Sequence, residues 1–378
     1  MQGKPSKVLV YCAAGGNSGD DYILHALVAK LRELNQDVEV TIACPNLVSA
    51  KYFDCDRWVR TLNQISTFYF GRGWLLGAVR DLRSTLGIFR ESSVIFVGGG
   101  GLFNDQFGFP WLAQWLAAPI VARLFRIRCV AVGVGAGPIV SPFARWATRK
   151  CMRLFDSISV RDQYSYDTLG AVMRDDRNLR LSMDPAFFGR AQEGEMETLV
   201  RAQTNMRLLF VPRFDAGLDA SVKTFIACLC VYAARRSVEL LLAASSTREF
   251  SILESFSSSL KGDMGRGVRV YDGSEHEKII SLIRSAGLLV TMRMHPAIFA
   301  SNVRARLITI ETYDPKLNSV AELVGCDNLR LDLRDEADID AKAKLCVEQV
   351  FQDRPAMPTV LETVIRRRLA VVERQLSL

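Results

Sequence analysis

Residues 287–302 have the sequence Gly-Leu-Leu-Val-Thr-Met-Arg-Met-His-Pro-Ala-Ile-Phe-Ala-Ser-Asn. The apolar run at 287–291 predicts a short strand that is buried on both faces of a parallel sheet. Pro296 follows, and proline is tolerated in the first turn of a helix because its missing N–H would have had no partner there. We therefore expect Arg293 and His295 at the carboxyl end of a strand and the amino end of a helix.

This position suits an anionic ligand. Open α/β sheets bind ligands at the carboxyl ends of their strands, and a helix start adds partial positive charge and N–H groups. Arg293 and His295 therefore predict a site for a phosphorylated or carboxylated substrate. The alternative is a surface arginine beside a packed histidine, and the placement between strand and helix favours the site.

The same alternation of strand, loop and helix occurs on both sides of a polar region at 175–205. Strands are expected at 7–12, 38–43, 93–97, 128–134 and 157–160, and again at 207–211, 238–243, 268–271 and 307–310. Two such series in 378 residues predict an α/β protein with two Rossmann-like, doubly wound domains. We place the domains at 1–178 and 179–345, with a helical tail at 346–378.

Glycine-rich loops follow two of the expected strands. The first loop, at 13–21, contains Asn17 and Asp20, but it lacks the Gly-x-Gly-x-x-Gly pattern and a Walker lysine, which disfavours a dinucleotide site. The second contains Gly99, Gly100 and Gly101 in a run of four glycines. Such a run costs conformational entropy, so it indicates close passage of the backbone past a ligand or another segment. Asn104 and Asp105 are expected at the rim of that passage.

Composition limits the partners. The formal net charge of +7 favours anionic partners, which include phosphates, nucleic acid and anionic membranes. Basic residues are interspersed with acids and form no aromatic-basic stripe, so we expect no nucleic acid. The nine cysteines are an odd number without a Cys-x-x-Cys pair, which favours reduced thiols in the cytoplasm and no metal site.

The segment most similar to a membrane segment is 107–122. It is interrupted by prolines and is shorter than the roughly 20 residues that a spanning helix needs, so we expect a buried core helix. The alternative is an interfacial contact with lipid. Its candidate residues are Trp111, Trp115, Arg123, Arg126 and Arg128.

Seven short motifs, in order, resemble the polysaccharide pyruvyl transferase family. They are Gly16-Asn-Ser-Gly-Asp20, Val97-Gly-Gly-Gly-Gly-Leu102 with Asp105, Gly133-Val-Gly-Ala-Gly-Pro138, Ser159-Val-Arg-Asp162, Asp184-Pro-Ala-Phe187, Met292-Arg-Met-His295 and Tyr313-Asp-Pro-Lys316. The resemblance implies a GT-B-like pair of domains facing a central cleft, with the acceptor on the N-terminal side. It also implies transfer of pyruvate from phosphoenolpyruvate to two hydroxyls of one sugar in a bacterial exopolysaccharide or its lipid-linked repeat unit. A pyruvate ketal forms, phosphate is released and no cofactor is needed.

Under this hypothesis, Arg293 and Arg213 bind the two anionic groups of phosphoenolpyruvate, because guanidinium groups contact phosphate and carboxylate bidentately. His295 is the expected acid, since histidine exchanges a proton near neutral pH. Asp105 is the candidate base or sugar ligand. The acceptor side is expected to include Asn17, Asp20, Gly99, Gly100, Gly101 and Asn104.

Two other functions are compatible with the sequence. One is a GT-B glycosyltransferase that uses a nucleotide-sugar donor, and the other is a catalytically silent family member. A lipid-linked acceptor would favour peripheral attachment to the inner face of the cytoplasmic membrane. The sequence does not specify the acceptor sugar or the oligomeric state.

Overall fold

We describe the protein from a computed structural model. The described residues are 6–13, 18–44, 55–60, 86–174, 177–189, 206–214, 219–260, 267–311, 315–332, 335–352 and 359–378. The chain divides into two compact units, which are described separately below. Unit 1 contains the first strand, Asp20–Phe188 and Ile365–Leu378, and unit 2 contains Gly189–Val364.

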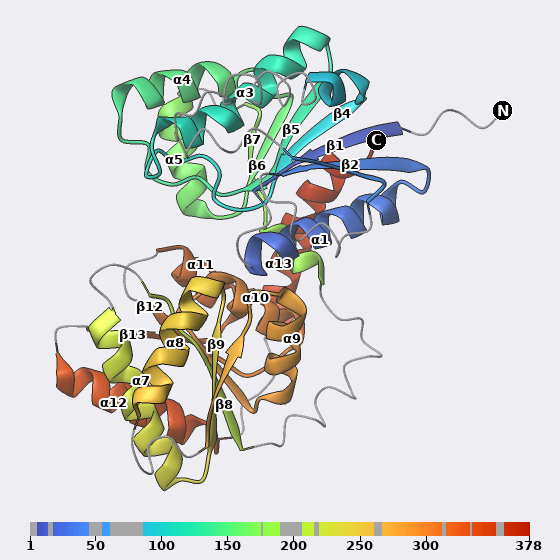
Figure 1. The fold of residues 1–378 in the computed structure, drawn as a ribbon. Coiled ribbons are helices and arrows are strands. Elements are labelled where there is room, and N and C mark those ends of the chain that lie inside the picture. The colour runs from blue at the N-terminus through green and yellow to red at the C-terminus, as the bar shows by residue number, and fades with distance from the viewer. Residues whose placement is uncertain are drawn as a thin grey trace, which may run out of the picture. The chain divides into compact units, whose positions relative to one another are not determined.

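Unit 1 is built on a seven-stranded parallel sheet in the order β3-β2-β1-β4-β5-β6-β7 (Figure 1). Its strands are β1 (Ser6–Tyr11), β2 (Val38–Cys44), β3 (Arg57–Arg60), β4 (Val94–Gly98), β5 (Arg128–Val134), β6 (Ser157–Val160) and β7 (Leu179–Leu181). Every residue of β4 is buried, as expected for a central strand that is covered on both faces.

The helices of unit 1 cover both faces of this sheet. They are α1 (Ser18–Leu34), α3 (Phe109–Phe125), α4 (Pro142–Met152), α5 (Gln163–Met173) and a 3-10 helix at Pro185–Gly189. Helix α1 connects β1 to β2 on one side of β1 in the sheet order. Helices α3, α4 and α5 connect the strands from β4 to β7 in the opposite direction. Because parallel crossovers are right-handed, α3, α4 and α5 lie on the face opposite to α1. Ile95, Trp115 and Met152 belong to the apolar cluster beneath these helices.

Unit 2 repeats the architecture with a six-stranded parallel sheet in the order β10-β9-β8-β11-β12-β13. Its strands are β8 (Arg207–Val211), β9 (Glu239–Ala244), β10 (Val268–Asp272), β11 (Leu288–Thr291), β12 (Leu307–Glu311) and β13 (Asp327–Arg330). Its helices are α7 (Asp219–Arg235), α8 (Thr247–Ser259), α9 (His276–Ser285), α10 (Met294–Asn302), α11 (Pro315–Val324) and α12 (Glu336–Gln349). Phe210, Phe225 and Val290 are fully buried in its core.

The last helix, α13 (Thr359–Leu376), begins in unit 2 and ends in unit 1. Its Gln375 is buried, accepts a hydrogen bond from Ser159 Oγ at 2.6 Å and donates to Ser157 Oγ at 2.8 Å. Glu373 pairs with Lys30 of α1 at 3.0 Å. The end of the chain is therefore attached to the α1 face of the first sheet.

The predicted fold class is confirmed, since both units are doubly wound parallel α/β structures. The short strands β3, β7 and β13 were not predicted. The expected boundary lay at 178, whereas the contacts group β7 and the 3-10 helix up to Phe188 with unit 1. Within the described ranges, every helix falls short of the length and apolarity that crossing a bilayer requires.

Candidate active site

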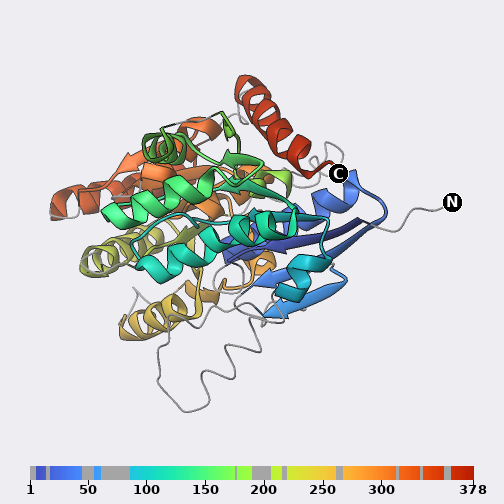
Figure 2. The same cartoon turned by 90° about the horizontal axis from the view of Figure 1, so that it is seen from above.

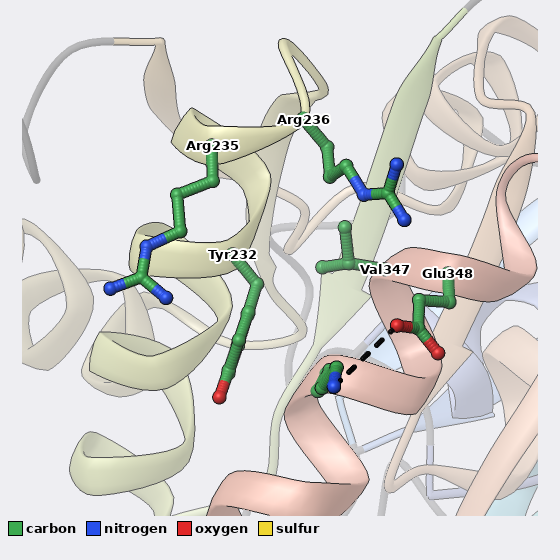
Figure 3. Close-up of a pocket in the computed structure, with 6 residues that line it drawn as sticks. Tyr232, Arg235, Arg236, Val347 and Glu348 are labelled. Carbon is green, nitrogen blue, oxygen red and sulfur yellow. Dashed lines mark ion pairs between the residues drawn. The ribbon is translucent and has the colours of Figure 1, made fainter.

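A hollow of about 390 Å³ lies on unit 2 between α7 and α12 (Figure 3). Its lining includes Arg235 and Arg236, which come just before β9 begins, and Lys344, which pairs with Glu348 at 3.9 Å. The hollow therefore lies at the edge where strands start. No predicted site residue lines it. Candidate residues gather instead at the opposite edge, where the strands of each unit end.

Arg293 stands where the sequence places it, between β11 and α10. It is the N-cap residue of α10, and its backbone N–H donates to Thr291 Oγ1 at 3.0 Å. Its Nε donates to the carbonyl of Pro212 at 3.0 Å. Pro212 follows β8, which pairs with β11, so the side chain joins the ends of two neighbouring strands.

A carboxylate that the sequence analysis did not identify holds this arginine. Glu249 on α8 forms an ion pair with Arg293 Nη2. Its oxygens also accept hydrogen bonds from the backbone N–H groups of Phe214 and Ser245, each at 3.3 Å. The Glu249 side chain is 5% exposed and that of Arg293 is 27% exposed. A buried acid therefore orients a cation that reaches the surface.

Arg213 and His295 lie at the same edge of unit 2. Arg213 follows β8 and is half-buried. His295 lies in the first turn of α10, where its ring stacks on Phe299 with the ring centroids 6.5 Å apart. The structure thus places Arg213, Arg293 and His295 at the ends of two adjacent strands, and such a group can bind an anion with two negative groups.

In unit 1 the glycine run packs against a second glycine segment. The Gly135 N–H donates to the Gly100 carbonyl at 2.9 Å, and Phe103 pairs with Ala136. Gly100 has φ +78°, and a Cβ on it would lie 2.5 Å from Asp20 Oδ1. A Cβ on Gly135 would lie 2.9 Å from Arg161 Nε. These two positions are glycine because charged side chains pass directly over the backbone.

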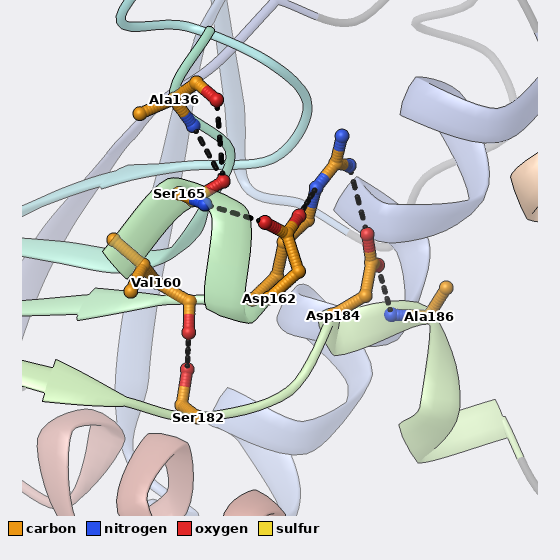
Figure 4. Close-up of polar contacts among 8 residues, drawn as sticks. Ala136, Val160, Asp162, Ser165, Ser182, Asp184 and Ala186 are labelled. Carbon is orange, nitrogen blue, oxygen red and sulfur yellow. Dashed lines mark hydrogen bonds and ion pairs between the residues drawn. The ribbon is translucent and has the colours of Figure 1, made fainter. Parts of the chain in front are cut away.

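Those side chains belong to a buried ion cluster at the ends of β6 and β7 (Figure 4). Arg161 pairs with Asp184 at 2.9 Å and with Asp162 at 3.4 Å, and all three side chains are less than a tenth exposed. Asp162 also caps α5 by accepting a hydrogen bond from the Ser165 N–H at 2.7 Å. Burial lowers the pKa of Arg161, but attraction to Asp184, Asp162 and Asp20 outweighs it and raises the pKa, so the guanidinium stays charged.

Asp20, in the first turn of α1, is the member of this set that is partly exposed. Asp162 and Asp184 pair with Arg161, and Asp20 lies beside Gly100 at the strand ends and also attracts Arg161. Among the described residues, no three His, Cys, Asp or Glu side chains are grouped as metal ligands. The arrangement therefore places a partly exposed carboxylate beside the glycine run.

The other predicted residues of unit 1 have structural contacts. Asn104 is buried, and its Nδ2 donates to the Gly101 carbonyl at 2.7 Å. Asp105 accepts hydrogen bonds from the N–H groups of Val140 at 3.0 Å and Ser141 at 2.8 Å, just before α4. These bonds hold the loop at the start of α4, and the role of Asp105 as a base stays a prediction.

Asn17 lies outside the described residues. Besides Glu249 in unit 2, three charged residues of unit 1 were missed as members of the site, namely Arg161, Asp162 and Asp184. They lie in the motifs Ser159-Val-Arg-Asp162 and Asp184-Pro-Ala-Phe187, which carried the family resemblance but received no role. A signal was present, because an Arg-Asp pair directly follows a buried strand.

Comparison with solved structures shows the fold. A structure described as a candidate UDP-N-acetylglucosamine 2-epimerase from Listeria monocytogenes is similar with a TM-score of 0.63 and 11% identity, covering 98% of this chain and 96% of that one. The UDP-N-acetylglucosamine 2-epimerase from Neisseria meningitidis bound to UDP-GlcNAc has a TM-score of 0.60 and 10% identity, with 96% and 100% covered. ADP-heptose heptosyltransferase II from Escherichia coli has a TM-score of 0.51 and 13% identity, with 91% and 99% covered. The neighbours are GT-B-fold proteins.

Comparison of the sequence identifies the family. A search of curated protein sequences found no match. A model of the family described as polysaccharide pyruvyl transferase matches residues 17–314, which include every predicted site residue. The chain therefore belongs to the polysaccharide pyruvyl transferase family.

Proposed function

We propose that this transferase uses phosphoenolpyruvate as donor and joins its three-carbon unit to two hydroxyls of one sugar as a cyclic ketal. The observation that carries the proposal is the position of Arg293 as N-cap of α10, one turn from His295 and beside Arg213. Phosphoenolpyruvate has a phosphate and a carboxylate, and two guanidinium groups match two anions.

The reaction balances without an oxidant or reductant. A proton adds to the CH₂ carbon of the enol and makes it a methyl group, while the first sugar hydroxyl forms a bond to the central carbon. The C–O bond to phosphate then breaks, and the second hydroxyl bonds to the same carbon. The two sugar hydroxyls lose two protons in total. One balances the proton added to the CH₂ carbon, and the other leaves with phosphate.

The residues of unit 2 have distinct tasks in this scheme. Arg293 and Arg213 bind the donor anions, and the first turn of α10 adds favourable dipole charge. His295 delivers the proton to the CH₂ carbon. Glu249 keeps the Arg293 guanidinium in place through the ion pair, so the cation does not have to be ordered when the donor binds.

Asp20 is our candidate for binding or deprotonating a sugar hydroxyl, with Asp105 as the alternative. Asp20 lies beside Gly100 in the glycine run. Asp105 lies near the start of α4, where both of its oxygens accept backbone hydrogen bonds that hold the loop. The acceptor we propose is a sugar of an exopolysaccharide repeat unit carried on a lipid, at the cytoplasmic side of the membrane. No nucleic acid and no cofactor is part of the proposal.

The test is phosphate release from phosphoenolpyruvate by the full-length protein, with a panel of free and lipid-linked oligosaccharides. We expect release that depends on the acceptor, together with an acceptor mass gain equal to a pyruvate ketal. Thermal shift measurements should show stabilisation by phosphoenolpyruvate and none by UDP or ADP. Stabilisation by a nucleoside diphosphate alone would indicate a glycosyltransferase, and binding without turnover on any acceptor would indicate a silent member.

A further inference from the structure

The outward face of α3 is apolar. The helix buries Leu112, Trp115 and Leu116 against the sheet. A surface helix normally presents polar residues on its other side, yet here Ile120 is 42% exposed and Leu124 is 75% exposed. The expectation of a core helix is therefore correct for only one face of α3.

Helix α4 presents aromatic and basic side chains to solvent. Phe143 is 56% exposed and Trp146 is 58% exposed. Lys150 and Arg153, both exposed, continue the same face at helical spacing. The opposite side of α4 is buried through Ala144, Ala147 and Met152.

The two surfaces are adjacent. Helices α3 and α4 pack side by side on one face of the first sheet (Figures 1 and 2). Phe109 of α3 and Phe143 of α4 contact each other with ring centroids 4.7 Å apart, and Phe143 stacks on Trp146 at 5.8 Å. We name this surface the α3–α4 face. It consists of Pro110, Ala117, Ile120, Leu124, Phe143, Trp146, Lys150 and Arg153.

The charge of this region has one sign. Residues 106–155 contain seven Arg and Lys residues and no Asp or Glu. The formal net charge of the whole chain is +7, so the rest of the chain is balanced and the excess lies in this segment. Basic residues at the ends of both helices, including Arg126 and Lys150, therefore border the apolar residues. Residues 106–155 contain no acid that could neutralise them.

We propose that the α3–α4 face binds the surface of an anionic phospholipid bilayer. Aromatic and aliphatic side chains insert at the boundary between lipid headgroups and acyl chains. Arginine and lysine side chains attract the anionic headgroups. The α3 helix has 17 residues, so the face is about 25 Å long and matches an extended lipid surface better than a point contact. A protein partner would need an acidic surface of the same length.

The face reaches the edge of the sheet that carries the site residues. Helices α3 and α4 both begin there, and Asp105 holds the chain at Val140 and Ser141, where α4 starts. If the proposed function is correct, a lipid-linked sugar would meet Asp20 and the glycine run at the membrane surface. Membrane binding itself does not depend on that chemistry.

The test is co-sedimentation of the full-length protein with vesicles of phosphatidylglycerol and phosphatidylcholine, compared with phosphatidylcholine alone. We expect binding to the anionic vesicles that weakens as salt rises from about 0.1 M to about 0.5 M. Leu124→Ser with Trp146→Ser, and separately Lys150→Glu with Arg153→Glu, should each lower binding about tenfold or more. Circular dichroism of each variant should match that of the unaltered protein.

Matched controls lie on unit 2. Met206→Ser with Phe351→Ser removes two exposed apolar side chains, which are 46% and 45% exposed. Arg330→Glu with Lys344→Glu makes the same change in net charge as Lys150→Glu with Arg153→Glu. Both should bind as the unaltered protein does. Equal losses in the controls, or no loss in the α3–α4 variants, would overturn the proposal. So would a dimer in gel filtration that the α3–α4 variants dissociate, because the face would then be a contact between copies.

Discussion

Each unit has a buried charge at the carboxyl edge of its sheet, and the more exposed charged group nearby is an acid in unit 1 and a cation in unit 2. In unit 1 a buried cation, Arg161, is enclosed by Asp162 and Asp184, and an acid, Asp20, is the partly exposed member. In unit 2 a buried acid, Glu249, lies beneath a cation, Arg293, that reaches the surface. In unit 2 an ion pair orients the exposed group, whereas in unit 1 Asp20 attracts Arg161 electrostatically.

The difference shows how one architecture provides two kinds of binding edge. Charges that are removed from water must be paired, so each buried ion constrains its partner to one geometry. The exposed group then determines the ligand class. A carboxylate at the edge of unit 1 suits hydroxyl groups, and a guanidinium at the edge of unit 2 suits phosphate or carboxylate.

The strongest test of the donor edge is His295→Ala. Loss of a general acid should lower turnover by about 10²-fold to 10⁴-fold. The fold should persist, because His295 is only partly buried and the apolar core of unit 2 does not include it. Initial rates and calorimetric binding of phosphoenolpyruvate should separate the two effects. Near-normal turnover would remove His295 from the acid role.

The strongest test of the unit 1 cluster is Arg161→Met. Asp162 and Asp184 would stay buried without a cation beside them. The free energy of unfolding of unit 1 should therefore fall by about 3–5 kcal/mol. Urea denaturation followed by tryptophan fluorescence measures this, since Trp115 lies in the core of unit 1. Arg161→Lys keeps the positive charge, so its free energy of unfolding should fall by less. A midpoint unchanged in both variants would mean that the cluster contributes nothing to stability.

Arg293→Lys should raise the KM for phosphoenolpyruvate about thirtyfold, because the loss of a charge-assisted hydrogen bond costs about 2 kcal/mol. A lysine has no planar fork to contact Pro212, Glu249 and the donor together. Steady-state kinetics with varied donor concentration gives the result. The acceptor KM serves as the internal control, and an equal rise in both constants would argue against a role specific to the donor.

The two acids of unit 1 are distinguished by Asp20→Asn and Asp105→Asn. Asp20→Asn should raise the acceptor KM about tenfold, since a hydrogen bond to a charged group is lost. It should also lower the melting temperature slightly, because one of the three acids that attract Arg161 loses its charge. Asp105→Asn should mainly lower the melting temperature, because one acceptor oxygen of the bonds to Val140 and Ser141 disappears. The reverse pattern would assign the base to Asp105.

The smallest effect is expected for Glu249→Ala compared with Glu249→Gln. If Glu249 positions Arg293, alanine should raise the donor KM about fivefold, whereas glutamine should restore most of it because its oxygen still accepts a hydrogen bond. A purely structural role would lower the melting temperature in both variants and leave the donor KM unchanged. Comparing KM with melting temperature therefore decides between the roles.

Much of the fold follows from local sequence patterns. The largely apolar runs of β4, β8 and β11 and the helix start at Pro296 are encoded by neighbouring residues, so they could be predicted. The strands β3 and β7 have only four and three residues, too few for a period to be detected. The exposed apolar face of α3 could not be predicted, because a helix that is apolar all round has no periodicity to show which side is buried.

The sequence by itself determined the parallel α/β architecture, the placement of Arg293 and His295 after a strand, and the glycine loops. Only the tertiary structure decided which charges meet. Arg161 and Asp184 are 23 residues apart, and Arg293 and Glu249 are 44 residues apart. Such pairs form because parallel strands bring their carboxyl ends to one edge, and the low polarity of the interior then requires each buried charge to have a partner.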